Sequence, residues 1–292
     1  MKLVKPYFEI WEQPAGLEGV YKQIEKAGRV CYKSEDKITE DSAKPFVDRM
    51  IKSGHNAMLE HGTVYLFCPT EEYVKSNGDV QYYNTLERYQ DNNYSALVNS
   101  NKGIYVTTNL RVLVETGWLN DLQYICEPTE YHERRITVHF VCDRGVSHEF
   151  VRHRVFSFAQ ESTRYCNYSK DKFGNELTFI QPCWFDSSLI DDTGHWDANT
   201  FYRMPTQSVE EDAFLGTLLS AEKSYFNLLE CGWKPQEARA VLPNSLKTEL
   251  VMTGFVSDWK HFFGLRCDSA AHPQARELAI PLREEFIKRN YI

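Results

Sequence analysis

The strongest constraint on the fold is a clear alternation of side-chain character from Arg135 to Cys142. The apolar face of this stretch consists of Ile136, Val138, Phe140 and Cys142, and the polar face carries Thr137 and His139. A period of two residues predicts a β-strand with one apolar and one polar face.

The rest of the chain mixes helical and strand patterns. Helices are predicted over 17–32, 40–53 (stopped by Gly54), 209–229 (stopped by Gly232), 235–242, 258–266 and 273–290. Another is predicted to start at Ser147 as its N-cap and to run through 148–156. Strands are predicted at 63–67, 104–107 and 248–253. We therefore predict one large α/β domain over residues 1–292, irregular at 176–206, with a turn-rich insertion at about 69–131.

Composition and charge exclude several classes of protein. The 292 residues are 42% hydrophobic and 25% charged, which excludes a disordered chain. The net charge of −8 argues against nucleic-acid binding and against an anionic membrane surface. The start of the sequence has no signal-peptide pattern, and no apolar run has the length of a membrane helix. The eight cysteines form no CxxC pair, so we expect a cytoplasmic protein with mostly buried free thiols.

The densest group of cations is Arg152-His153-Arg154, followed by Ser162 and Arg164. On a helix, Arg152 and Arg154 would point about 200° apart, so they would grip different parts of a large anionic ligand. The alternative is a solvated basic face paired with Glu149 and Glu161. The sequence contains neither GxG nor GxSxG, which removes the Rossmann, P-loop and simple α/β-hydrolase interpretations.

Histidines provide two further candidates. His61 follows Glu60 just before a predicted strand, where it is either a structural residue or a polar donor at the rim of a planar ligand. His148 and His153 are five residues apart, whereas a zinc-binding HExxH pair is four apart, so no metal site is predicted.

In this order, the motifs resemble the flavin-dependent thymidylate synthases. The family is marked by RHR, seven or eight residues and then a serine, as in 152–162 here. The other matching blocks are Arg29–Tyr32, Glu60-His61, Glu237–Pro243 and His261–Arg266, so the resemblance covers roughly residues 17–67 and 132–290. It implies a central, mostly antiparallel sheet flanked by long helices. It also implies methylation of dUMP to dTMP, with 5,10-methylenetetrahydrofolate as carbon donor, FAD as cofactor and NADPH as reductant.

The resemblance also implies roles for individual residues. The cofactor-binding set is His61, Thr63, Arg152, His153, Arg154, Gln160, Phe255 and His261. The substrate-binding set is Glu149, Arg152, Gln160, Glu161, Ser162, Thr163, Arg164, Arg239 and Arg266. Arg266 is the expected catalytic residue, because a guanidinium beside the pyrimidine stabilises developing negative charge. Family members build each site from more than one chain, so a homotetramer with shared sites is expected.

This chain departs from the family pattern at Ala159-Gln160-Glu161, where Asn-Glu often precedes the serine, and at Phe255, where an Asn often meets FAD. Two other functions are alternatives to the one that the resemblance implies. A cysteine-dependent thymidylate synthase would need a Pro-Cys-His setting, but Pro182-Cys183 is followed by Trp184. A non-catalytic nucleotide-binding module would use Arg152, Arg154 and Arg164 without turnover.

Overall fold

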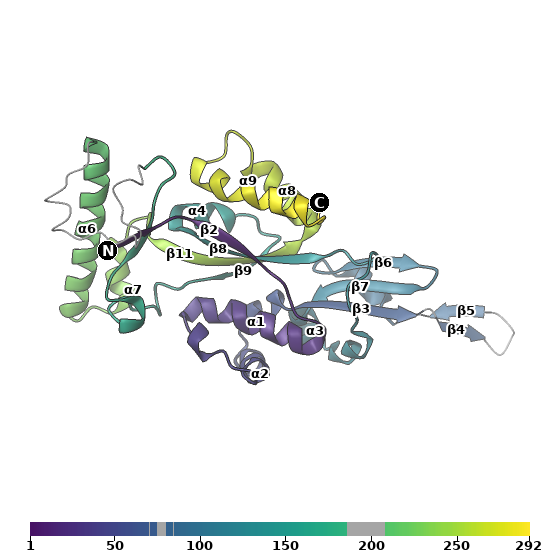
Figure 1. The fold of residues 1–292 in the computed structure, drawn as a ribbon. Coiled ribbons are helices and arrows are strands. Elements are labelled where there is room, and N and C mark those ends of the chain that lie inside the picture. The colour runs from purple at the N-terminus through teal and green to yellow at the C-terminus, as the bar shows by residue number, and fades with distance from the viewer. Residues whose placement is uncertain (70, 75–79, 84, 186–207) are drawn as a thin grey trace.

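The protein is built around a four-stranded antiparallel sheet, with the order β2-β8-β11-β9 (Figure 1). The computed structural model describes residues 1–69, 71–74, 80–83, 85–185 and 208–292. The sheet strands are β2 (Tyr7–Trp11), β8 (Arg135–Asp143), β9 (Ser157–Gln160) and β11 (Lys247–Phe255). The predicted alternation from 135 to 142 is thus confirmed as a central strand, and the α/β fold class with its antiparallel sheet is confirmed as well.

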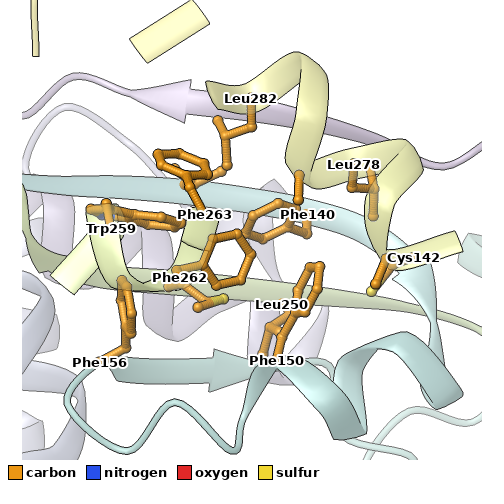
Figure 2. Packing of buried hydrophobic residues seen from close by; sticks show 14 of the residues in the cluster. Phe140, Cys142, Phe150, Phe156, Leu250, Trp259, Phe262, Phe263, Leu278 and Leu282 are labelled. Carbon is orange, nitrogen blue, oxygen red and sulfur yellow. The ribbon is translucent and has the colours of Figure 1, made fainter. Parts of the chain in front are cut away.

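One face of this sheet packs against three helices. These are α4 (Arg144–Phe150), α8 (Val256–Arg266) and α9 (Pro273–Lys288). Figure 2 shows the aromatic side chains of α8 packed beside Phe140, together with Leu278 and Leu282 of α9. Trp259 is fully buried, and its indole Nε1 donates to the Ile136 carbonyl at 3.1 Å. A Cβ at Gly254 would lie 2.5 Å from the Phe156 ring, so this close approach requires glycine.

The opposite face carries polar side chains and is covered by α1 (Gly16–Tyr32) and the short helix η2 (Asn56–His61). Helix α2 (Ala43–Ser53) packs against α1, and Gly54 ends it with a φ of 69°. The predicted boundaries of both long helices are therefore confirmed to within three residues. This arrangement seals the polar face of the central sheet from solvent, so its hydrogen-bonding groups must find partners inside the protein.

Most of the stretch from 69 to 131 forms structure of its own. A three-stranded antiparallel sheet has the order β3-β7-β6, from Thr63–Pro69, Gly103–Asn109 and Ala96–Ser100. The hairpin of β4 (Glu71–Val74) and β5 (Val80–Tyr83) extends from its end in Figure 1. Helix α3 (Leu110–Thr116) contributes to a second apolar cluster with α1, α2, β3 and β7. The strand predicted at 104–107 is confirmed within β7, and the boundaries of an insertion stay a prediction.

A third apolar cluster lies near the N-terminus, where β1 (Lys2–Val4) pairs in parallel with β10 (Thr178–Ile180). Helices α6 (Val209–Glu230) and α7 (Pro235–Ala238) pack there. The predicted irregular stretch 176–206 contains β10, and its residues 186–206 lie outside the described ones. The other 3-10 helices of the described residues are η1 (Glu35–Lys37), η3 (Glu87–Asp91), η4 (Leu119–Tyr124), η5 (Asp171–Phe173) and η7 (Arg239–Val241). Within the described ranges, no helix has the length and apolar character needed to cross a membrane.

Two predicted helix starts need correction. Helix α4 begins at Arg144 and ends at Phe150, so it does not run through 148–156. Its N-cap is Asp143, whose carboxylate accepts from the Val146 N–H at 2.7 Å, whereas Ser147 lies inside the helix. Asp258 is the third residue of α8, and it accepts from the Phe255 N–H at 3.0 Å. An aspartate can cap from either position, and the sequence alone does not distinguish the two.

Candidate functional site

The Arg152-His153-Arg154 motif lies on a turn between α4 and β9, because α4 ends two residues earlier. The argument that the two arginines point about 200° apart on a helix is therefore wrong. Both side chains are exposed, and neither guanidinium has a hydrogen bond or ion pair with any described residue. His153 between them is buried. The turn thus presents two free cations to solvent and holds the imidazole inside.

His153 and Glu149 together hold the side chain of Arg266. The Nε of Arg266 donates to Nε2 of His153 at 3.0 Å. Its Nη1 donates to the Glu149 carboxylate and its Nη2 to the Glu149 carbonyl, both at 2.7 Å. The exposed His261 ring lies 6.1 Å from the His153 ring. His261 and Arg266, both on α8, therefore approach the imidazole of His153 from two positions. We call Glu149, His153, His261 and Arg266 the arginine cluster.

Burial and the neighbouring Arg266 charge lower the pKa of His153 to about 4. The ring is therefore neutral near pH 7, and its Nε2 accepts the hydrogen bond from Arg266. Glu149 supplies the negative charge that pairs with Arg266. The His153 ring and the carboxylate and carbonyl of Glu149 together fix the orientation of the Arg266 guanidinium.

A second group of predicted residues lies on the polar face of the sheet. His61 is fully buried, and its Nδ1 lies 2.8 Å from the Thr253 hydroxyl, which lies 2.9 Å from that of Thr137. Burial and the charge of Arg135 lower the pKa of His61 to about 3. Thr63 is also buried, and its hydroxyl accepts from Arg135 Nη1 at 3.3 Å.

The neighbouring Phe255 is half-buried, with the Arg135 guanidinium 5.5 Å from its ring centre. The sequence prediction missed Arg135 and Thr253 as members of this group. The one signal for them is the pairing of β8 with β11, which places both residues on the same face of the sheet as Thr137. A cation and a second hydroxyl on a buried face are unusual inside a protein.

Gln160 and Glu161 point to different surroundings. The amide of Gln160 donates to the Ser147 hydroxyl at 2.9 Å and to the Thr248 hydroxyl at 3.2 Å. Glu161 is buried and accepts from Lys247 Nζ and from the Tyr168 hydroxyl, both at 2.9 Å. Its carboxylate is already engaged inside the chain, so its predicted substrate contact stays a prediction.

The predicted phosphate-binding residues form a third group, after β9. The Ser162 hydroxyl accepts from the Arg164 N–H at 3.3 Å, and Thr163 accepts from Arg239 Nη1 at 3.2 Å. The guanidinium groups of Arg164 and Arg239 are both on exposed residues. Among the described residues, no hydrogen bond or ion pair joins this group to the arginine cluster. One chain therefore presents the predicted site in separate parts.

None of the eight cysteines forms a disulfide: Cys68, Cys142 and Cys166 are buried, Cys183 and Cys231 are exposed, and the others are half-buried. The expectation of mostly buried thiols is therefore wrong, because only three of the eight are fully buried. Burial raises the pKa of the Cys166 thiol to about 12, which opposes thiolate formation. Within the part of the chain that the structure describes, no three His, Cys, Asp or Glu side chains gather as metal ligands.

Comparison with known proteins agrees with the sequence resemblance. A family model described as "Thymidylate synthase complementing protein" matches residues 128–289, more than half of the chain. A "Flavin-dependent thymidylate synthase" of Corynebacterium aurimucosum is 25% identical over 280 residues, covering 92% of this chain and 77% of that protein.

Proteins with the same name from Pyrococcus horikoshii and Geobacter sulfurreducens are 31% and 29% identical. Those alignments cover 51% and 48% of this chain, and 52% and 50% of the relatives. Residues 128–289, which the family model matches, contain the RHR turn, the phosphate-binding candidates and the whole arginine cluster. The chain belongs to the flavin-dependent thymidylate synthase family.

Proposed function

We propose that this protein is an enzyme that converts dUMP to dTMP, with FAD as its cofactor, 5,10-methylenetetrahydrofolate as carbon donor and NADPH as reductant. The observation that carries the proposal is the arginine cluster, in which Arg266 is held by a carboxylate, a carbonyl and a neutral imidazole. Family membership supplies the class of reaction, and the named relatives support the use of a flavin.

The side chains of the RHR turn fit a dianionic, planar cofactor such as FAD. Arg152 and Arg154 are exposed and unpaired within the described chain, so they keep their donors for phosphate oxygens. His261 is exposed beside the buried His153 and offers a polar edge to a planar ring. When bound, the flavin supplies hydride transfer. The residues that would hold it are Arg152, His153, Arg154, His261 and, on the polar face, His61, Thr63 and Phe255.

The group formed by Ser162, Thr163, Arg164 and Arg239 suits the phosphate and sugar of dUMP. The hydroxyls of Ser162 and Thr163 and the guanidiniums of Arg164 and Arg239 are the donors that a phosphate monoester requires. In this proposal Ser162 is a binding residue, and no cysteine acts as the nucleophile.

Arg266 would act on the pyrimidine. A fixed cation beside the ring stabilises negative charge as it develops at the carbonyl oxygen, and it does so at little reorganisation cost because its position is already set. The neutral state of His153 matters here, since a second positive charge 3.0 Å from Arg266 Nε would compete for Glu149. His153 and Glu149 therefore orient the guanidinium and preserve its charge.

We further propose that the enzyme is a cytoplasmic homotetramer with shared active sites, binding neither nucleic acid nor membrane. The support from this chain is that no hydrogen bond or ion pair joins the arginine cluster to the phosphate-binding group among its described residues. Packing of a neighbouring subunit would bring such groups together, and it would give the exposed arginines anionic ligands to share.

The test is a reconstituted assay. Purified protein is examined for flavin absorbance and then for dTMP formation by chromatography, with dUMP, 5,10-methylenetetrahydrofolate, FAD and NADPH omitted one at a time. We expect no dTMP when dUMP, 5,10-methylenetetrahydrofolate or NADPH is omitted, and a requirement for added FAD in protein that has been stripped of flavin. Binding of FAD and dUMP without any dTMP would instead favour the nucleotide-binding module, and absence of flavin binding would refute the proposal.

A further inference from the structure

Arg135 is a buried cation that the proposed chemistry leaves unexplained. It begins β8, directly opposite Phe255 of β11, and only 9% of the residue is exposed. Among the described residues, no carboxylate forms an ion pair with it. The nearby carboxylate of Glu60 pairs with Arg111, and that of Asp258 accepts from the Phe255 backbone. A buried charge without an ionic partner costs several kcal/mol, so its presence calls for a compensating group.

The hydrogen bonds of Arg135 leave part of its donor set free. Nη1 donates to the Glu60 carbonyl at 2.9 Å and to the Thr63 hydroxyl at 3.3 Å, and Nη2 donates to the Ser157 hydroxyl at 3.3 Å. All three acceptors are neutral. A guanidinium has five N–H donors, so one on Nη2 remains, and the buried Nε has no partner. Two donors on adjacent nitrogens are the number that a bidentate oxyanion contact uses.

The surroundings of Arg135 have room and chemistry for such an anion. Together with Thr63, Gln13, Arg134 and Thr137, it lines a cavity of about 180 Å³. Glu12 and Glu127 also line this cavity, and the Glu12 carboxylate is paired with Arg289 at 2.9 Å. Because about 10–15 Å³ of such volume is enough for one water molecule, this cavity has room for a phosphate group. Its guanidinium also lies over the Phe255 ring, a residue of the proposed flavin site.

We propose that Arg135 binds a phosphate group of a dinucleotide cofactor. The inference rests on the proposed function, because FAD and NADPH are the two dinucleotides of the reaction. It deepens that function by assigning a cofactor-binding residue on β8, outside the RHR turn. Arg135 on β8 pairs with Phe255 on β11. In this proposal Arg135 gives the cofactor a polar contact beside the apolar ring of Phe255. The hydrogen bonds to the Thr63 and Ser157 hydroxyls hold the Arg135 guanidinium in place.

The experiment compares the wild type with Arg135→Gln, Arg135→Lys and the control Arg134→Gln. Arg134 is an exposed arginine that lines the same cavity, so it tests general positive charge against the buried fork. Affinities of the flavin-free protein for FAD and for riboflavin are measured by flavin fluorescence, and affinity for NADPH by its own fluorescence. Circular dichroism and thermal unfolding verify that each variant is folded.

We expect Arg135→Gln to weaken FAD binding about 10- to 100-fold, the range for a lost charged hydrogen bond, and to leave riboflavin binding unchanged. Arg135→Lys keeps the charge but loses the fork, so its loss should be intermediate. A loss confined to NADPH would assign the phosphate to the other dinucleotide. Unchanged affinity for both dinucleotides, an equal loss for riboflavin, or an equal loss in Arg134→Gln would overturn the inference.

A wild-type protein that binds neither FAD nor riboflavin would refute the proposed function. The phosphate site at Arg135 is then tested separately, by measuring whether inorganic pyrophosphate stabilises the protein against thermal unfolding. Stabilisation of the wild type by pyrophosphate that disappears in Arg135→Gln but persists in Arg134→Gln would support a phosphate site. The same stabilisation in all three proteins, or none in any, would refute it.

Discussion

Two buried neutral imidazoles make a specific prediction about acid stability. His61 is fully buried with a pKa of about 3, and His153 is buried with a pKa of about 4, both below the ordinary value of 6.5. A folded-state pKa below the unfolded one means that the unfolded chain binds the proton more tightly. Each histidine therefore contributes stability that is complete above about pH 6.5 and is lost as the pH falls toward the folded-state pKa.

The size of the effect follows from the shifts. A pH of 5 lies 1.5 units below the unfolded-state pKa of 6.5 and still above the folded-state pKa of both histidines. At about 1.4 kcal/mol per unit, each histidine destabilises the fold by about 2 kcal/mol relative to pH 8. The two together remove about 4 kcal/mol, a large part of the 5–15 kcal/mol typical of a domain.

The assay is urea unfolding at pH 8 and pH 5 for the wild type, His61→Gln and His153→Gln. Buried Asp143 and Asp258 have raised pKa values and act with the opposite sign, but they are present in all three proteins, so the comparison cancels them. We expect each variant to lose about 2 kcal/mol less than the wild type between the two pH values. The same loss in all three proteins would show that neither imidazole is held neutral by the fold.

Three further outcomes are expected. Arg266→Ala should keep its flavin absorbance but lose about 2–4 kcal/mol of transition-state stabilisation in kcat/KM with dUMP; unchanged kcat/KM would remove Arg266 from the chemistry. Cys166→Ser and Cys183→Ser should retain dTMP formation, because neither thiol is placed for activation; complete loss with normal folding and flavin content would favour a cysteine nucleophile. If Arg154 and Arg266 serve one site from different subunits, mixing inactive Arg154→Ala and Arg266→Ala proteins should partly restore activity after subunit exchange. A monomer by light scattering would contradict the shared site, and tetramers without rescue would assign both residues to one chain.

Local patterns in the sequence predict the elements of this fold well. The alternation before Cys142 predicts β8, and Gly54 predicts the end of α2, because each depends on side chains or backbone angles close in the chain. The start of α4 was missed because Asp143 and Ser147 are both good caps, and only the backbone shows which one accepts the Val146 N–H.

The site was harder to predict because its contacts join residues far apart in sequence. Glu149 and Arg266 were assigned to the substrate from motifs, but their ion pair closes across 117 residues. Arg135 belongs to no sequence motif. Its burial and its free donors are seen only in the folded structure, where β11, β9 and the start of β3 surround it. Such contacts depend on sheet order, which local periodicity does not specify.

The most direct test of the proposed reaction is a single turnover without NADPH. The protein is loaded with FAD, reduced chemically under anaerobic conditions and mixed with dUMP and 5,10-methylenetetrahydrofolate, while flavin absorbance and dTMP are followed together. The account predicts that the oxidised-flavin absorbance returns only when both substrates are present and that one dTMP forms for each flavin reoxidised. Reoxidation without dTMP, or no reoxidation with both substrates bound, would contradict it.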